Sequence, residues 1–354
     1  MFPPVPDKQK ALWLPKAQGQ YTIGEADIPK PGPGEVLICE QAVGLNFVDH
    51  LVQKVGIFVK EYPVISGFEG AGVVIGVGEG VRDVSVGDRV FHPSIIGNAY
   101  GGFKQYSTIP ADLVAKLPRN LSYDRAAAIP LAFNTAALGL YAPSAERGGA
   151  ALTPFWEPEG LRKYAGQPIL VLGGSSSVGQ FAIQLAKLSG FSPIITTASL
   201  KHAEFLKGLG ATHVLDRSLP AASIQSELGK ITSEPFKVIY DAVSYEDTQN
   251  IGYDLLASGG TLIIDTSPKI AESKRSADKN IAFILADPTI PDRRKLTADL
   301  YKHVPAYFAS EDLKPNHIEV LPNGLAGIPD GIERLAKGEV SGLKLIARPQ
   351  ETPA

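Results

Sequence analysis

The chain has 354 residues, of which 44% are hydrophobic, enough for about two domains with cores of their own. It carries 34 Lys and Arg against 37 Asp and Glu, and this near-neutral balance offers no general attraction to nucleic acid or to an anionic membrane surface. A single cysteine, Cys39, excludes an intrachain disulfide and any metal centre that needs several thiolates. Residues 1–15 lack the basic and apolar regions of a secretory signal, and no window approaches about 18 apolar residues in a row. We therefore expect a cytoplasmic protein with no nucleic-acid or membrane partner.

Short β-type runs punctuated by glycine and proline occupy the first third of the chain. They lie at 36–39, 72–78 and 87–91. Such short strands at close spacing, without long helical patterns, predict a compact and mostly antiparallel barrel over about residues 1–125.

The character of the sequence changes near residue 126. Alanine-rich runs at 124–129 and 134–140 predict helices. A stretch rich in Pro, Gly and Glu follows at 143–168 and predicts an irregular insertion rather than a core element.

From residue 169 onward, strand and helix patterns alternate. Residues 168–172 form a short and wholly apolar run, as expected of a buried parallel strand. Residues 178–188 carry apolar positions at helical spacing and end at Gly190, a C-cap candidate. The repeating unit predicts an α/β fold with a doubly wound parallel sheet. Further strands are expected at 193–197, 213–215, 237–241, 261–265 and 343–347, and further helices at 201–209, 221–228, 247–256 and 291–308.

A glycine-rich turn joins the first buried strand to its helix. In the run from Gly173 to Gly179, the dinucleotide fingerprint G-x-G-x-x-G is matched with serine at its middle position. Small residues are needed there because the chain turns tightly, its backbone approaches a pyrophosphate, and the helix N-terminus supplies free N–H groups. Gln180 and Phe181 stand where a nucleoside-triphosphate loop needs lysine and a hydroxyl, which disfavours that alternative. A merely connecting turn is the other alternative. The expected dinucleotide contacts are Gly174, Ser175, Ser176, Ser177, Val178 and Gly179.

Residues at the end of the second strand of this sheet decide which dinucleotide is bound. An NAD site places Asp or Glu there for the ribose hydroxyls, whereas an NADP site has small polar and basic groups that accept a phosphate. The stretch 196–202 contains no acid and offers Thr197, Ser199 and Lys201, and Arg217 follows the third strand as a further phosphate ligand. The sequence therefore predicts NADPH as the cofactor.

Four motifs occur in an order that resembles a known family. They are Gly-Leu-Asn-Phe-Val-Asp at 44–49, Gly-Phe-Glu-Gly-Ala-Gly-Val-Val at 67–74, Val-Gly-Asp-Arg-Val at 86–90, and the glycine turn. Together they resemble the medium-chain dehydrogenase/reductases, which include alcohol dehydrogenases, quinone oxidoreductases and enoyl reductases. The resemblance implies a GroES-like β-barrel catalytic domain made of residues 1–130 and 310–354, with a Rossmann domain at 131–309 inserted between them.

The chain departs from the zinc-dependent members of that family at their ligand positions. Asn46 stands where alcohol dehydrogenases carry a cysteine ligand, and Phe68 replaces the histidine of their Gly-His-Glu motif. Neither side chain supplies a thiolate or an imidazole, so no metal is expected. The six histidines show no ligand spacing and are interpreted as surface or loop residues: His50, His92, His202, His213, His303 and His317.

The form of the motif at 44–49 resembles the zinc-independent quinone oxidoreductase and enoyl reductase branch. The insertion and the version of the glycine turn resemble most closely the fungal trans-acting enoyl reductases. This resemblance implies an NADPH-dependent reductase that transfers hydride to an activated C=C bond, in an enone or an enoyl thioester, or to a quinone. A non-catalytic NADPH-binding protein is the alternative, because Phe58 stands where some relatives have a proton-donating tyrosine. Homodimer and monomer both stay open, as does action in trans with a larger synthase.

Site residues follow from the same resemblance. It places Asn46 and Asp49 near the nicotinamide and Thr135 against the cofactor. Asn46 either donates to the substrate carbonyl or caps a local turn, and Asp49 is expected to orient that turn. Lys344 either approaches the cofactor or is a solvated lysine. Ser244 lies at the carboxyl end of a predicted strand, where this fold binds ligands.

Overall fold

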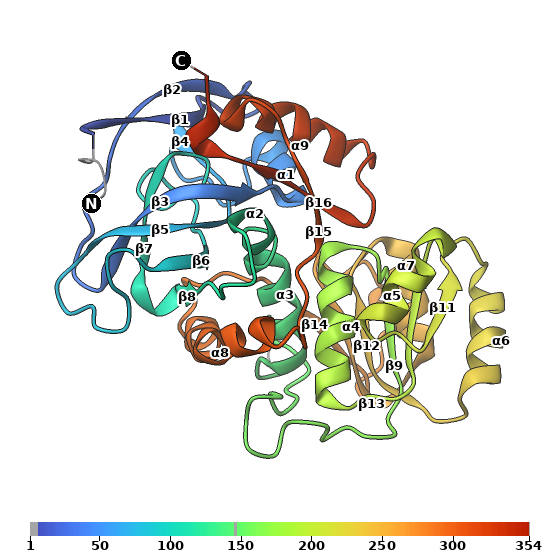
Figure 1. Cartoon of the computed structure of the whole chain (residues 1–354). Coiled ribbons are helices and arrows are strands. Elements are labelled where there is room, and N and C mark those ends of the chain that lie inside the picture. Colours follow the sequence, from blue (N-terminus) through green and yellow to red (C-terminus); the bar gives the residue numbers. More distant parts are fainter. Residues whose placement is uncertain (1–5, 145–146, 354) are drawn as a thin grey trace. The chain divides into compact units, whose positions relative to one another are not determined.

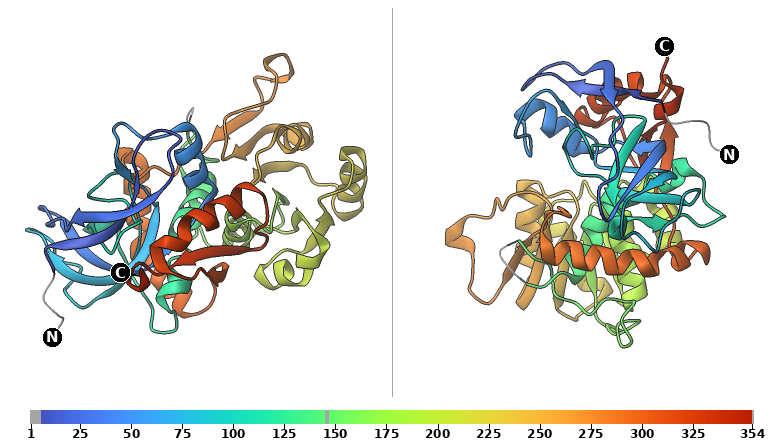
Figure 2. Two further views of the ribbon diagram at one scale, coloured as in Figure 1. Left: turned by 90° about the horizontal axis from the view of Figure 1, so that it is seen from above. Right: turned by 90° about the vertical axis from the view of Figure 1, so that its left-hand side faces the viewer.

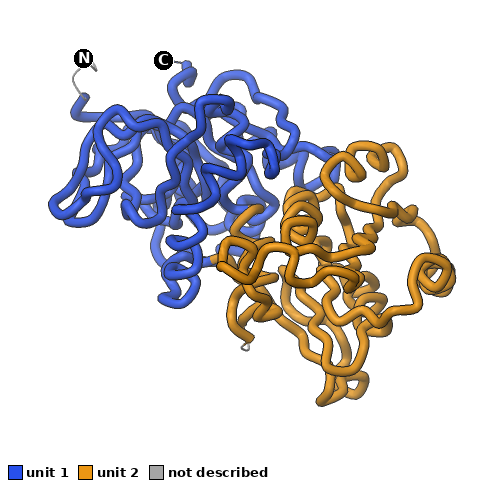
Figure 3. The backbone as a smooth tube through the Cα atoms, turned by 60° about the horizontal axis from the view of Figure 1, so that its bottom comes forward, with its two compact units in different colours: residues 1–131, 287–354 blue, residues 132–286 orange. Residues whose placement is uncertain are grey.

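The computed structural model describes residues 6–144 and 147–353, and the chain divides into two compact units. The first unit comprises residues 1–131 and 287–354, and the second comprises residues 132–286 (Figure 3). The chain therefore leaves the first unit and later returns to it.

Antiparallel pairing dominates the first unit. Its strands are β1 (Lys8–Leu14), β2 (Thr22–Asp27), β3 (Glu35–Gly44), β4 (Val64–Ile65), β5 (Glu69–Val77), β6 (Arg89–Pro93), β7 (Tyr106–Pro110), β8 (Ala115–Lys116), β15 (His317–Val320) and β16 (Leu343–Ala347). A seven-stranded sheet has the order β15-β16-β3-β5-β6-β8, with β7 paired to β3, and a smaller sheet has the order β2-β1-β4 (Figure 1). β3 is thus central, since β16, β5 and β7 all pair with it.

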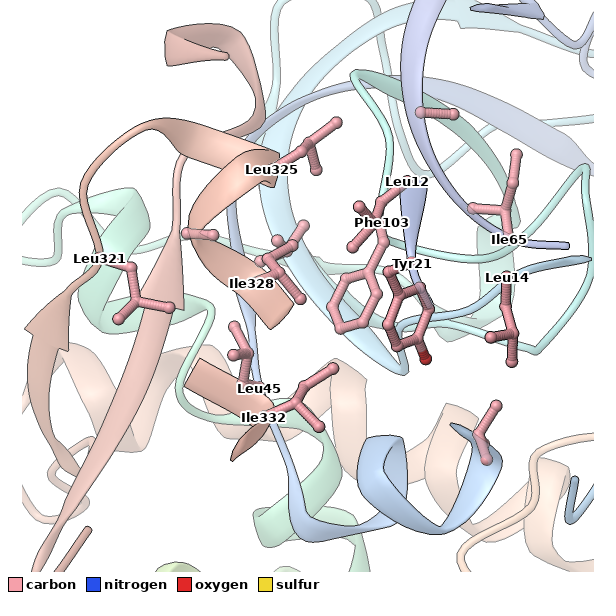
Figure 4. Packing of buried hydrophobic residues seen from close by; sticks show 14 of the residues in the cluster. Leu12, Leu14, Tyr21, Leu45, Ile65, Phe103, Leu321, Leu325, Ile328 and Ile332 are labelled. Atoms are coloured by element: carbon pink, nitrogen blue, oxygen red, sulfur yellow. The ribbon is translucent and has the colours of Figure 1, made fainter. Parts of the chain in front are cut away.

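The C-terminal segment completes the core of the first unit. This unit contains the helices α1 (Phe47–Val55), α2 (Tyr123–Ala126), α8 (Pro291–Ala309) and α9 (Ile328–Ala336). Ile328 and Ile332 of α9 and Leu321 before it pack in one cluster with Leu12 and Leu45 (Figure 4). The two stretches of chain therefore share one hydrophobic core.

Helix α8 belongs to the first unit, whereas residues up to 309 were expected in the nucleotide-binding domain. Its Phe308 ring lies 6.1 Å from the Phe91 ring, edge to face, and its Tyr301 ring lies 5.7 Å from the same partner. Figure 2 shows α8 (orange) as one long helix, although Pro305 lies inside it. Periodicity in a sequence shows that a helix has an apolar side but not which core covers that side. The expected boundary at 309–310 therefore moves to 286–287.

The second unit is built on a six-stranded parallel sheet. Its strands are β9 (Ile169–Leu172), β10 (Ile194–Ala198), β11 (His213–Asp216), β12 (Phe236–Asp241), β13 (Leu256–Ile264) and β14 (Asn280–Phe283). Its helices are α3 (Pro130–Tyr141), which begins at the junction, α4 (Ser177–Ser189), α5 (Ala203–Leu209), α6 (Ala221–Ile231) and α7 (Glu246–Leu255). The order β11-β10-β9-β12-β13-β14 reverses beside β9, the strand order of a Rossmann fold. The predicted doubly wound parallel sheet is confirmed.

The predicted insertion at 143–168 contains no helix or strand among its described residues, and residues 145–146 lie outside the described part. The segment still contributes to a core, because Phe155 is buried and its ring lies 6.1 Å from that of Tyr141. Across the described ranges of the chain, no helix is long and apolar enough to span a membrane.

One histidine contradicts its interpretation as a surface or loop residue. His92 lies in β6 with no exposed surface, and its Nε2 is 3.1 Å from Oε1 of the buried Glu40. Ser107 donates a hydrogen bond to the same carboxylate. Gly70 leaves the room for this group, since a Cβ there would lie 2.5 Å from Glu40 Oε2. Hydrophobic patterning does not distinguish a buried, paired histidine from a solvated one.

We expect Phe308→Ala to lower the free energy of unfolding of the first unit by about 3 kcal/mol, because it empties a buried ring site against Phe91. Urea unfolding followed by the fluorescence of Trp13 in β1, in a Trp156→Phe background, measures this unit. Lys302→Ala on the exposed side of α8 is the control and should change stability by less than about 0.5 kcal/mol. A similarly small loss for Phe308→Ala would contradict the assignment of α8.

Candidate active site

The glycine turn between β9 and α4 has the form that a bound pyrophosphate needs. Gly173 adopts a φ of 81°, in the left-handed region. A Cβ on Gly174 would overlap Thr196 Oγ1, and a Cβ on Gly179 would overlap the Gly173 carbonyl oxygen. Ser176 is the N-cap of α4, and its Oγ accepts a hydrogen bond from Gly179 N at 2.9 Å. The turn thus leaves no room for larger residues and opens a 13-residue helix whose dipole favours an anion.

The other predicted residues of the turn lie around the same helix end. Ser175, Ser177 and Val178 are half-buried, so this edge of the turn reaches solvent. The chain therefore fits a dinucleotide at this position by its shape and by the backbone groups at the start of α4.

The residues expected to bind the second phosphate differ in how deeply they are buried. Thr197 is buried, and its Oγ1 accepts a hydrogen bond from Gly173 N at 3.1 Å, so this hydroxyl braces the glycine turn. Ser199 is half-buried, and Lys201 and Arg217 are exposed. The backbone N–H of Arg217 donates to the last residue of β10 at 3.0 Å. Ser199 and Lys201 thus follow β10, and Arg217 follows the neighbouring strand β11.

Asp216, which the sequence analysis did not weigh, ends β11 beside these cations. Its Oδ1 accepts hydrogen bonds from Ser218 N at 2.9 Å and from Ser218 Oγ at 2.8 Å, and they hold the pKa of Asp216 below its usual value. This carboxylate is therefore ionised and bonded into its own loop.

Ser244 follows β12 in a tightly bonded loop. It is buried with a φ of 54°, its N–H donates to Asp241 Oδ1 at 2.8 Å, and its Oγ accepts from Asp265 N at 3.0 Å. Its hydroxyl thus joins the carboxyl ends of β12 and β13. Thr135 lies half-buried on α3, where its carbonyl oxygen accepts from Tyr240 Oη at 2.9 Å.

The first unit places Asn46 at the start of α1. The backbone N–H of Asn46 donates to Asp49 Oδ2 at 2.7 Å, and Asp49 N donates back to the Asn46 carbonyl oxygen at 3.0 Å. Asp49 is completely buried. It therefore holds the turn from which the Asn46 side chain projects.

The side chain of Asn46 contacts a buried ion pair. Its Nδ2 donates to Glu69 Oε1 at 2.6 Å, and its Oδ1 accepts from Lys344 Nζ at 2.6 Å. Lys344 Nζ also lies 2.6 Å from Glu69 Oε1, and these two side chains are 2% and 0% exposed. The alternative of a solvated Lys344 is therefore wrong, because β16 carries this lysine into the interior, and its approach to the cofactor stays a prediction.

Strand pairing explains why three distant residues meet. β16 pairs with β3 through Ile346 opposite Gly44, and continuing this register sets Lys344 opposite Asn46. β5 lies on the other side of β3, and a Cβ on Gly44 would lie 2.5 Å from Glu69 Oε1. Sequence reasoning missed Glu69, although an acid in a glycine-rich strand is a signal for a buried, paired carboxylate.

Two family models match this chain, and so do curated relatives over most of its length. The model described as "Alcohol dehydrogenase GroES-like domain" matches residues 32–119, and the model described as "Zinc-binding dehydrogenase" matches residues 177–283. Dehydrogenase orsE from Emericella nidulans is 30% identical over 95% of this chain and 98% of its own length. Trans-enoyl reductase himH from Aspergillus japonicus is 30% identical over 95% of this chain and 96% of its own length. The chain belongs to the medium-chain dehydrogenase/reductase family.

A solved structure agrees with this assignment. An alcohol dehydrogenase superfamily protein from Novosphingobium aromaticivorans superposes with a TM-score of 0.79 at 23% identity, over 95% of this chain and 99% of that chain. The match confirms the GroES-like and Rossmann folds, and the fungal relatives confirm the resemblance to trans-enoyl reductases. As a reductase of the medium-chain family, the chain is an oxidoreductase with a nicotinamide cofactor.

Asn46 and Phe68 occupy the positions at which zinc-dependent relatives were expected to hold the metal. Phe68 is half-buried, and its ring packs edge to face on Phe58 at 6.4 Å. Within residues 6–144 and 147–353, no group of three or more His, Cys, Asp or Glu side chains could hold a metal ion. A metal-free site stays a prediction, which rests on the residue types at these two positions.

The pKa of the buried Asp49 carboxyl group lies far above that of an ordinary aspartate. Burial raises the pKa of Asp49 to about 8 against the hydrogen bond from Asn46, and Glu69 adds to the rise while Lys344 opposes it. Its Oδ1 is buried without a hydrogen-bond partner, in agreement with a carboxyl group that keeps its proton at neutral pH.

We expect Asp49→Asn to remove a pH dependence of stability. The folded-state pKa of about 8 exceeds the ordinary value of 3.8, so the folded chain holds one more proton than the unfolded chain between these values. The free energy of unfolding therefore falls as the pH rises through this window, by at most about 1.4 kcal/mol per unit from this group. Denaturant unfolding at about pH 5 and about pH 8.5 should show Asp49→Asn gaining on the wild type as the pH rises, since Asn still accepts the Asn46 N–H.

The control is Asp27→Asn, because the Asp27 side chain is 83% exposed and its substitution removes no buried carboxyl group. A stability difference between Asp49→Asn and the wild type that stays constant over this range would contradict the raised pKa of Asp49.

Proposed function

We propose that this chain is an NADPH-dependent reductase that adds hydride to a C=C bond conjugated with a carbonyl, in an enone or an enoyl thioester. The observation that carries the proposal is the amide of the half-buried residue Asn46, which lies at the start of α1 and is held by the buried Glu69 and Lys344. NADPH, when bound, supplies the hydride. Addition to the far carbon leaves negative charge on the carbonyl oxygen, and a preorganised amide N–H stabilises that charge.

The preference for NADPH is supported by the end of β10. Ser199 and Lys201 follow β10, the backbone of Arg217 is bonded to the last residue of that strand, and a hydroxyl and two cations suit a 2′-phosphate. The backbone of the glycine turn would hold the pyrophosphate. Thr135 and Ser244 stay predicted cofactor contacts.

The relatives favour an enoyl substrate over a quinone. Trans-enoyl reductase himH carries the enoyl group in its name. Asn46 and Phe68 offer neither thiolate nor imidazole, so the chain's own contribution to carbonyl activation is hydrogen bonding, which suffices for an enolate. A quinone is the second acceptor to test. A cytoplasmic location and a homodimer stay predictions from the sequence and the resemblance.

Activity is tested by following the absorbance of reduced nicotinamide with a crotonyl thioester, simple enones and quinones. We expect NADPH consumption with the C=C substrates, and Asn46→Ala should lower kcat by about 100-fold because the oxyanion loses a donor. The KM for NADPH should stay unchanged in this variant. Tight NADPH binding by the wild type without turnover of any acceptor would instead support a non-catalytic NADPH-binding protein.

Cofactor choice has a separate test. Lys201→Ala and Arg217→Ala should each raise the KM for NADPH by about tenfold, the effect of losing one charge-assisted hydrogen bond, and leave the KM for NADH unchanged. Lys207→Ala is the matched control, because Lys207 is an exposed cation on α5 that pairs with Glu204 at 2.9 Å. Equal use of NADH and NADPH by the wild type would contradict the phosphate site.

A further inference from the structure

We propose that Glu69 and Lys344 are positioning residues for hydride addition, which orient the Asn46 amide so that an Nδ2 hydrogen, and not Oδ1, faces the substrate carbonyl. The inference rests on the proposed function. It adds an explanation of which end of the Asn46 amide faces the substrate. An asparagine alone does not set it, because the oxygen and the nitrogen of its amide are nearly equal in size.

The two partners of the amide differ in kind. Lys344 Nζ can only donate hydrogen bonds, and the Glu69 carboxylate can only accept them. Nζ lies 2.6 Å from Asn46 Oδ1, and Glu69 Oε1 lies 2.6 Å from Asn46 Nδ2. A flipped amide would set its oxygen against the carboxylate and its nitrogen against the ammonium, and both attractive contacts would become repulsive. Only one orientation is therefore compatible with this pair.

This orientation leaves one donor at the surface of the cluster. The amide nitrogen carries two hydrogens, and Glu69 takes one of them. Asn46 as a residue is half-buried, whereas the side chains of Lys344 and Glu69 are 2% and 0% exposed, so Asn46 is the member of the three that solvent can reach. The ammonium at Oδ1 draws electron density out of the amide and strengthens the remaining N–H as a donor.

Stability alone is a weak reason for such a pair. Buried ion pairs often contribute no more to folding than apolar groups of similar size, because both charges lose their hydration. The orientation of the Glu69 carboxylate is also fixed. Its Oε2 accepts a hydrogen bond from Leu131 N at 2.7 Å, so the carboxylate cannot turn away from Asn46 without losing that bond. The carboxylate is thus fixed on one side by the backbone and presents Oε1 to the amide.

The first test is the double variant Glu69→Gln/Lys344→Met, which removes both charges together and leaves no unpaired buried ion. We expect kcat for an enone to fall by about twofold or more, because the amide then populates both orientations and only one of them presents an N–H to the carbonyl. The KM for NADPH and the thermal unfolding midpoint should stay within the range of the control. That control is Glu319→Gln/Arg334→Met, which neutralises another ion pair of the first unit, with N–O distances of 2.6 Å and 2.9 Å. Unchanged kcat in Glu69→Gln/Lys344→Met would overturn the inference.

A second test separates positioning from a general structural effect. If the pair acts through the amide, the same double substitution should cause no further loss of kcat in an Asn46→Ala background. A further loss of kcat in the Asn46→Ala background would show that the pair acts by another route. The same conclusion would follow if the double substitution lowered kcat while Asn46→Ala alone left it unchanged.

A third test needs no turnover and so distinguishes failure of this inference from failure of the proposed function. Proton–nitrogen correlation spectra identify the Asn46 side-chain amide by its absence in Asn46→Ala. We expect one of its two protons to be shifted downfield by the carboxylate in the wild type and to return to the ordinary range in Glu69→Gln/Lys344→Met. Two ordinary shifts in the wild type would refute the orientation, even if the chain reduces enones.

Discussion

The ion pair between Lys344 and Glu69 is the contact on which the first unit's site depends. It joins β16 to β5 across β3, and Asn46 is bonded to both partners. The same carboxylate bonds to the backbone of Leu131, where the chain leaves this unit. Loss of one partner would leave an uncompensated charge in the interior, which costs about 3–5 kcal/mol. One charged contact therefore ties the tail, the start of α1 and the exit of the chain together.

The glycine turn of the second unit depends on close packing and not on a charged contact. Atoms already occupy the space beside Gly174 and Gly179, so the turn depends on small residues. Thr197 braces the same turn from β10. Shape thus constrains the residues of this turn, whereas the cations Lys201 and Arg217 are exposed.

Much of this fold could be predicted from the sequence, because local chemistry encodes it. The turn from Gly173 to Gly179 and the alternation after it led to a doubly wound sheet, since apolar runs and glycine positions follow directly from burial and backbone geometry. Asn46 was recognised by its motif, but its bonding to Glu69 and Lys344 was not, because strand register across 298 residues is not visible in a pattern.

The errors have the same origin. Helix α8 was assigned to the wrong unit because the pattern of its apolar face does not show that it packs against Phe91. His92 was interpreted as a surface or loop residue because Glu40, its partner, lies on another strand. The hydrogen bond from Gly173 N to the Thr197 hydroxyl also became visible only in three dimensions, and contact of Thr197 with a phosphate stays a prediction. Local sequence patterns therefore do not predict contacts between residues that lie far apart in the chain.

The discontinuous first unit also imposes an order in time. During synthesis the chain of the second unit is finished while the first still lacks residues 287–354. Lys344 emerges 298 residues after Asn46, a delay of about 15 to 60 s at ordinary rates of translation. Throughout that interval Leu12, Leu45 and their neighbours lack the α9 side chains that cover them in the finished core. The nascent chain thus exposes an apolar surface that its own last segment later covers.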